Sequence, residues 1–101
     1  MIRGTTPTHT FKKIPVMASD IKAIKITYKQ GEEVVLTKRK ADCTIEDGII
    51  STKLTQEDTF LFKDGELVEI QLRILDKTEN VTGTFVKRVS VEECLDDEVL
   101  T

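Results

Sequence analysis

The sequence predicts an all-β protein, and specifically an immunoglobulin-like antiparallel β-sandwich of about seven strands with one short helical turn near residues 55–61. Apolar and polar residues alternate with a period of two along most of the chain, which is the pattern of half-buried strands. Turn signals that contain glycine separate these segments at short intervals, as in known sandwiches. The length of 101 residues fits one domain with one hydrophobic core.

The first hairpin is predicted between residues 21–29 and 33–39, after a weak opening strand at residues 8–14. Gly31 lies between the two segments and supplies the positive φ that a tight turn needs. The side chains expected to face the core are Ile24, Ile26, Tyr28, Val34 and Leu36. The alternate side chains expected to face solvent are Lys25, Thr27, Lys29, Val35 and Thr37.

A second hairpin is predicted around Asp47-Gly48, because an Asp-Gly pair favours a tight turn between two short strands. The strands are expected at residues 43–45 and 49–54. The residues expected on the buried side are Leu54 and one of Ile49 and Ile50.

Residues 55–61 interrupt the strand pattern and predict a single turn of helix. Thr55 can act as the N-cap, and Asp58 stands at the third helical position, where its carboxylate can accept a bond from the Thr55 N–H. The turn should carry the chain from one sheet to the other. At least one of Phe60 and Phe62 is expected in the core.

The second half of the domain is predicted from one strong strand and one closing strand. Asp64-Gly65 forms a turn before the strand at residues 66–75, a loop follows at 76–83, and residues 84–91 close the domain. The inward side chains of the strong strand are Val68, Ile70, Leu72 and Ile74. Those of the closing strand are Val89, Val91 and one of Phe85 and Val86.

Charge divides the chain into a β-sandwich domain at residues 1–91 and an acidic C-terminal tail at residues 92–101, for which a helical turn at 92–95 is one option. Five of the 18 acidic residues lie in the tail, which has no Lys or Arg, so residues 1–91 carry 15 basic and 13 acidic groups, a difference of +2. This body lacks the basic field typical of nucleic-acid binders. We interpret the basic runs at 38–40 and 87–88 as edge protection, since lysines on edge strands oppose sheet aggregation.

The sequence offers few groups for catalysis or metal binding. His9 is the only histidine, whereas a catalytic triad or a zinc site needs several groups, so we interpret it as a surface or turn residue. The carboxylates at 96–98 lack the alternating spacing and the glycine of a calcium loop. We expect Cys43 and Cys94 to be reduced. The prediction is therefore a protein that is not an enzyme, with no catalytic residue, cofactor or metal.

The chain also lacks a predicted membrane segment. No apolar run approaches the roughly 20 residues that a membrane span needs, and residues 1–7 lack the apolar stretch of a signal peptide. We therefore expect a cytoplasmic protein without membrane contact, which leaves the cell only as part of a larger assembly.

Several stretches of the chain resemble a known class of proteins. They are residues 3–11, 47–50, 54–59, 68–73 and 94–100. Together they resemble small uncharacterised proteins encoded among the structural genes of phages and prophages of Gram-positive bacteria. The order of parts is also similar to the N-terminal β-sandwich domain of phage baseplate upper proteins, in which a Leu-Thr-x-x-x-Thr crossover precedes the strand that ends the core. The resemblance implies a tail or baseplate role in a phage particle assembled in the host cytoplasm, and it brings no catalytic residues.

The expected function is protein–protein docking as a virion-associated structural or assembly module. Because no receptor-binding or fibre region follows the sandwich, an adaptor or decoration role is favoured. The expected partners are other virion or prophage structural proteins, with a second copy of the chain as a further option, bound through the acidic tail and an exposed edge strand. The predicted contact residues are Glu92, Glu93, Leu95, Asp96, Asp97, Val99 and Leu100. The alternative is an intracellular binding protein that regulates a host factor or a nucleic acid through residues 38–40.

Overall fold

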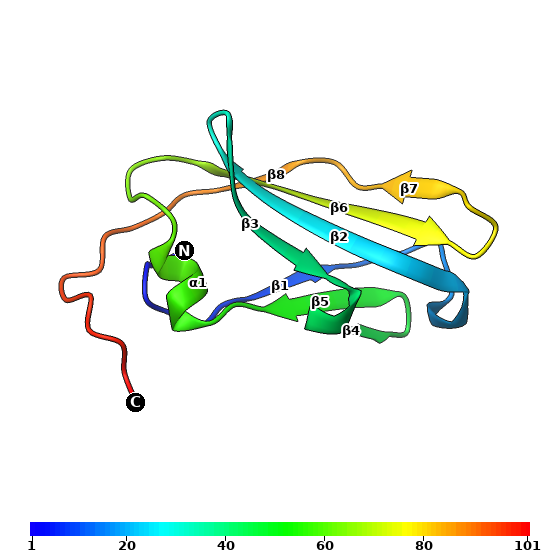
Figure 1. The fold of residues 1–101 in the computed structure, drawn as a ribbon, viewed down its shortest axis with the longest axis horizontal. Helices are drawn as coiled ribbons and strands as arrows, with labels where there is room; N and C mark the ends of the chain where they lie inside the picture. The colour runs from blue at the N-terminus through cyan, green and yellow to red at the C-terminus, as the bar shows by residue number, and fades with distance from the viewer.

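Two antiparallel sheets lie face to face in the structure, a computed structural model that describes residues 1–101 (Figure 1). The smaller sheet has the order β1-β5-β4, formed by Thr8–Phe11 (β1), Ile49–Lys53 (β5) and Cys43–Glu46 (β4). The larger sheet has the order β3-β2-β6-β7, formed by Glu33–Arg39 (β3), Ile21–Gln30 (β2), Val68–Asp76 (β6) and Val81–Gly83 (β7). Lys87–Val89 (β8) also pairs with β6. The helical elements are Ala18–Asp20 (η1), Lys40–Asp42 (η2) and Gln56–Phe60 (α1).

The order of the strands confirms the predicted immunoglobulin-like sandwich. If β1 to β6 are equated with immunoglobulin strands B, C, C′, D, E and F, and β7 with β8 is equated with G, the sheets become B-E-D and C′-C-F-G. This is the immunoglobulin arrangement without strand A. The chain has eight strands where about seven were predicted, because β7 forms at Val81–Gly83, within residues 76–83 that were predicted to be a loop.

The core lies between the two sheets and contains 13 buried apolar side chains. Its centre is the pairing of β2 with β6, in which Ile26 faces Leu72 and Tyr28 faces Ile70. All four predicted inward residues of β6 are buried. Full burial of one such aliphatic side chain is worth about 1.5–3 kcal/mol, so the pairing of β2 with β6 contributes several such increments to the stability of the sandwich.

A β-bulge in β3 overturns one predicted inward position. Tyr28 pairs with Leu36 while Lys29 pairs with Val34, so Val35 is an extra residue in the ladder. The extra residue shifts the alternation of side chains. Val34, predicted to face the core, is 53% exposed, whereas Val35, predicted to face solvent, packs against the core.

A second irregularity separates β7 from β8 and shortens the predicted strand at residues 84–91 to Lys87–Val89. Gly83 pairs with Arg73, but Lys87 pairs with Ile70, so the segment from 83 to 87 holds one residue more than its partner. Thr84 fills the gap in the ladder, because its Oγ1 accepts a hydrogen bond from Leu72 N at 3.2 Å. The predicted burial of Phe85 or Val86 is wrong, since Phe85 is 96% exposed and Val86 is also exposed. The predicted inward positions Val89 and Val91 are confirmed.

The crossover at α1 has the predicted capping box. Thr55 Oγ1 accepts from Asp58 N at 3.1 Å, and the Asp58 carboxylate accepts from Thr55 N at 2.9 Å. Phe62 is buried, and Phe60 covers Gly4, where the φ of +80° and the 2.6 Å from an added Cβ to the Phe60 ring exclude a larger residue. The crossover therefore also anchors the N-terminal segment to the body.

Candidate functional site

The predicted docking segment, residues 92–101, is an irregular extended segment at the end of the sandwich that carries α1 (Figure 1). We call it the acidic segment. It forms no helical turn at residues 92–95. Its first residue is held by a parallel bridge to Ile2, in which Arg3 N donates to Glu92 O at 3.1 Å and Glu92 N donates to Met1 O at 2.8 Å. The beginning of the segment is therefore paired with the body.

Two side chains of the body hold the rest of the acidic segment. The Gln56 side chain, on α1, donates to Leu100 O at 2.8 Å and accepts from Leu100 N at 2.7 Å. Arg3 lies 3.5 Å from an Asp97 carboxylate oxygen. These contacts keep both ends of the segment close to α1.

The acidic segment still presents most of its predicted contact groups to solvent. Leu95 is 96% exposed and Leu100 is 74% exposed, while Val99 is only 37% exposed. The carboxylates of Glu93, Asp96 and Glu98 take part in no ion pair. Of the seven predicted contact residues, the structure thus leaves Glu93, Leu95 and Leu100 with the freest side chains. Glu92 and Asp97 contact the body, and the Asp96 carboxylate accepts from Glu98 N at 2.9 Å within the segment.

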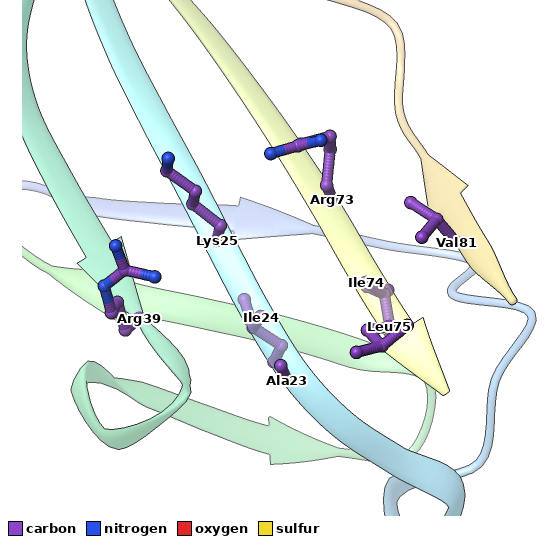
Figure 2. A pocket seen from close by; sticks show the side chains of 8 residues that line it. All are labelled: Ala23, Ile24, Lys25, Arg39, Arg73, Ile74, Leu75 and Val81. Carbon is purple, nitrogen blue, oxygen red and sulfur yellow. The ribbon is translucent and has the colours of Figure 1, made fainter. Parts of the chain in front are cut away.

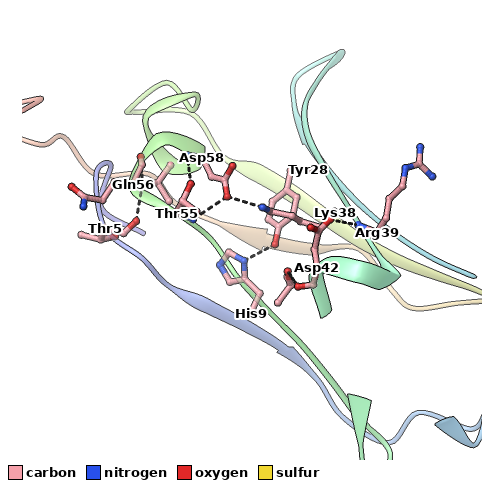
Figure 3. A network of polar contacts seen from close by, with 11 residues as sticks. Thr5, His9, Tyr28, Lys38, Arg39, Asp42, Thr55, Gln56 and Asp58 are labelled. Carbon is pink, nitrogen blue, oxygen red and sulfur yellow. Dashed lines mark hydrogen bonds and ion pairs between the residues drawn. The ribbon is translucent and has the colours of Figure 1, made fainter. Parts of the chain in front are cut away.

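A polar network closes one seam between the two sheets (Figure 3). Lys38, on the edge strand β3, donates to the Asp58 carboxylate at 2.7 Å, and both side chains are less than one-fifth exposed. Burial alone would raise the pKa of Asp58, but the bonds from Lys38 and Thr55 outweigh it and hold that pKa below its ordinary value. The ion pair therefore stays charged at neutral pH and joins β3 to α1.

His9 belongs to the same seam, and its predicted place at the surface or in a turn is wrong. His9 is half-buried on β1, and its Nδ1 lies 2.7 Å from the hydroxyl of the fully buried Tyr28 (Figure 3). Burial lowers the pKa of His9 and raises the pKa of Tyr28, so both groups are neutral near pH 7. Since the Tyr28 ring is enclosed, this pair satisfies a buried hydroxyl between the sheets.

The two cysteines are free thiols at separate positions. Cys43 Sγ donates to Arg39 O at 3.3 Å, and Cys94 Sγ donates to Asp96 O at 3.0 Å. Burial raises the pKa of Cys43, and the nearby carboxylate of Asp42 raises it further. Cys43 is therefore a protonated thiol with weak nucleophilic character at neutral pH.

The basic runs do not form basic patches. In the first run, Lys38 pairs with Asp58 and Lys40 donates to Ile21 O at 2.8 Å, so only Arg39 is left without a partner. In the second run, Lys87 donates to Thr10 O at 3.0 Å and its ammonium lies 4.6 Å from the centre of the Phe11 ring. Lys38 and Lys87 thus point inward from β3 and β8 at the two sides of the larger sheet, a placement that protects exposed edges.

The outer face of the larger sheet has a shallow depression of about 190 Å³ (Figure 2). Three basic side chains line it: Lys25 on β2, Arg39 on β3 and Arg73 on β6. The alternation along residues 21–29 predicts Lys25 on a solvent face, but the sequence alone does not bring the three cations together, because they are far apart along the chain. Only the strand register, which pairs Lys25 with both Arg39 and Arg73, makes them neighbours.

Residues 1–101 contain neither a metal-binding cluster nor a helix that could span a membrane. No group of three or more His, Cys, Asp or Glu side chains is arranged to hold a metal ion. None of the helices has the length and apolar character needed to cross a membrane. In comparisons with known proteins, no family model, no curated protein and no solved structure matches this chain.

Proposed function

We propose that this chain is a non-enzymatic structural or assembly module of a phage or prophage particle, and that it acts by docking to other proteins through the acidic segment. The observation that carries this proposal is the exposure of Leu95 among unpaired carboxylates. An apolar side chain that is 96% exposed contributes nothing to the core, whereas it can supply an anchor in a protein interface. The resemblance to phage structural proteins supplies the biological setting.

The body of the protein supports the same proposal by holding the segment in place. Gln56 and Arg3 fix its backbone and one carboxylate, so part of the ordering entropy of docking is lost before a partner binds. The His9–Tyr28 and Lys38–Asp58 pairs contribute by stabilising the seam next to α1, on which Gln56 stands. In this proposal these polar groups are structural.

The experiment is incorporation into particles made by the strain that encodes the chain. Removal of residues 95–101 and the double variant Leu95→Ser/Leu100→Ser should each reduce co-sedimentation with the particle at least about tenfold, the change expected when an interface anchor is lost. Leu67→Ser is the matched control, because Leu67 is 56% exposed and lies outside the segment. Unchanged incorporation of both segment variants would refute docking through the acidic segment, and absence of the wild-type chain from the particle would refute the virion role.

A second candidate function is the regulation of a nucleic acid or host factor inside the cell. The observation in its favour is the group of unpaired cations Lys25, Arg39 and Arg73, since residues 38–40 by themselves do not form a basic patch. DNA binding that weakens steeply with salt and is lost in Lys25→Gln/Arg73→Gln would support this second function.

A further inference from the structure

Three cations stand side by side on the outer face of the larger sheet. Lys25 is directly opposite Arg39 on one side and Arg73 on the other, so their Cβ atoms are about 4.5–5.5 Å apart from pair to pair. Figure 2 shows the three side chains in this row, which we call the cationic row. None of the three takes part in an ion pair or a side-chain hydrogen bond within the chain.

The cationic row is unfavourable for the isolated chain. Like charges placed directly opposite one another destabilise a sheet, and none of the three side chains forms an ion pair with a carboxylate of this chain. The acidic residue on the same face of β6, Glu69, lies further along the strand and pairs with Arg88 at 3.3 Å. A row that costs stability and has no partner within the chain is best explained by an anionic partner outside it.

Apolar side chains border the cationic row. In the adjacent row Ala23 faces Leu75, which in turn faces Val81, and Val81 is 63% exposed. The surface thus combines a line of positive charge with a line of apolar contact. An extended acidic peptide that also carries an apolar side chain has the complementary pattern.

The acidic segment has this composition. Leu95 is the exposed apolar group, and Glu93, Asp96 and Glu98 are carboxylates without an ion pair. Leu95 would contact the apolar row, and the carboxylates would face the cations of the cationic row. The chain therefore carries both halves of a complementary contact.

The two halves are too far apart to meet within one copy. Val91 O accepts from Gly65 N and Gln56 holds Leu100, so the acidic segment stays at the α1 end of the sandwich. Arg73 lies five residues beyond Val68, where β6 begins, which is about 17 Å along the strand. The acidic segment can therefore reach a cationic row only on another copy of the chain.

We propose that this protein associates head to tail, with the acidic segment of each copy bound to the cationic row of the next. This inference rests on the proposed docking function and names a second copy as the partner. Since the contact joins two different surfaces, it is heterologous, and its repetition yields a ring or a filament.

The experiment measures association of the purified chain by sedimentation velocity. The wild-type chain should form species larger than a monomer below about 1 mM, and an increase in ionic strength from about 0.02 M to about 0.5 M should weaken the association at least about tenfold. Two variants, each with the charges of one surface neutralised, test the cationic row and the acidic segment separately. One is Lys25→Gln/Arg73→Gln, and the other is Glu93→Gln/Asp96→Asn/Glu98→Gln.

Each neutralised variant alone should remain a monomer, because each lacks one half of the contact. A mixture of the two should give a 1:1 dimer and nothing larger, since only one complete contact is available. Lys29→Gln is the control for charge on the same face and should associate like the wild type. A monomeric wild type, or a mixture that stays monomeric, would overturn the inference.

Other results distinguish this inference from the proposed function. Incorporation of a monomeric chain into the particle would reject self-association and leave docking in place. Self-association of a chain that never enters the particle would reject the virion role and leave head-to-tail contact in place. Binding of duplex DNA to a monomeric wild type, lost in Lys25→Gln/Arg73→Gln, would assign the cationic row to nucleic acid and overturn the inference.

Discussion

The two faces of the larger sheet differ in whether their positively charged side chains have partners within the chain. On the inner face, Lys38 pairs with Asp58. Lys87 donates to the backbone carbonyl of Thr10, and its ammonium lies over the Phe11 ring. On the outer face, the cationic row has no partner within the chain. The comparison shows that the sequence supplies partners where an unpaired charge would be costly for folding, and leaves charges unpaired where solvent or another molecule can reach them.

The largest expected effect tests the difference in packing between the two faces. Leu72→Ala should lower the free energy of unfolding by about 2–5 kcal/mol, because Leu72 is fully buried and its truncation leaves a cavity. Arg73→Gln, at the next position on the opposite face, should change it by less than about 0.5 kcal/mol. Urea denaturation measures both, and similar losses for the two variants would contradict the assignment of inner and outer faces.

A smaller loss is expected when an inner cation loses its partner. Asp58→Ala removes the carboxylate that accepts a hydrogen bond from Thr55 N and leaves the Lys38 ammonium without its partner, at a cost of about 1–3 kcal/mol. Glu57→Ala is the matched control, since Glu57 is an exposed neighbour on the same helix. The measurement is again urea denaturation. An equal effect of both substitutions would show that the seam does not depend on the ion pair.

The folded domain should also lose stability in acid because of His9, which lies in the seam. Burial holds the pKa of folded His9 below the ordinary 6.5, with the charges of the N-terminal ammonium and then of Lys87 as lesser contributions. As the pH falls through 6.5 the unfolded chain binds a proton that the folded chain does not, so stability declines until the pH passes the folded pKa. Asp58 acts in a separate window, below its ordinary pKa of 3.8.

Urea denaturation at about pH 7.5 and about pH 5 tests this response, because the two conditions lie on either side of the ordinary histidine pKa. The wild type should lose more stability between these conditions than His9→Gln does. A loss of equal size in both proteins would mean that His9 does not contribute to the acid sensitivity.

The smallest effect is expected in the cationic row. Lys25→Gln should raise the stability of the monomer slightly, by no more than about 0.5 kcal/mol, and the gain should shrink as salt screens the repulsion. Lys29→Gln provides the contrast, because Lys29 lies opposite Glu69 and its removal should cost stability. Thermal unfolding of dilute protein at low and high salt would show whether Lys25→Gln raises the stability of the monomer and Lys29→Gln lowers it. A loss of stability in both variants would contradict repulsion among the cations of the cationic row.

The alternation of apolar residues was sufficient to predict seven of the eight strands and most of the core, but not β7, which lies in a segment predicted to be a loop. It identified all four inward residues of β6 and the capping box at Thr55, because these depend on short-range spacing. It failed at Val34 and Phe85, where a bulge adds one residue and reverses the faces. A bulge depends on the fit between neighbouring strands, which the periodicity of one strand does not contain.

The candidate sites show the same limit. The acidic segment is continuous in sequence, so its composition alone identified it. The cationic row is assembled from β2, β3 and β6, and it becomes visible only when the register is known. His9 was misplaced for a related reason, since its partner Tyr28 comes from the opposite sheet.

The most direct test of docking through the acidic segment is site-specific photo-crosslinking in cells that produce the particle. A photoreactive residue at position 95, in place of the exposed Leu95, should crosslink to a structural protein of the particle or to a second copy of the chain. The same residue at position 67, also exposed, should give no such product. The absence of a crosslinked partner from position 95, or an equal yield from position 67, would contradict docking through the acidic segment.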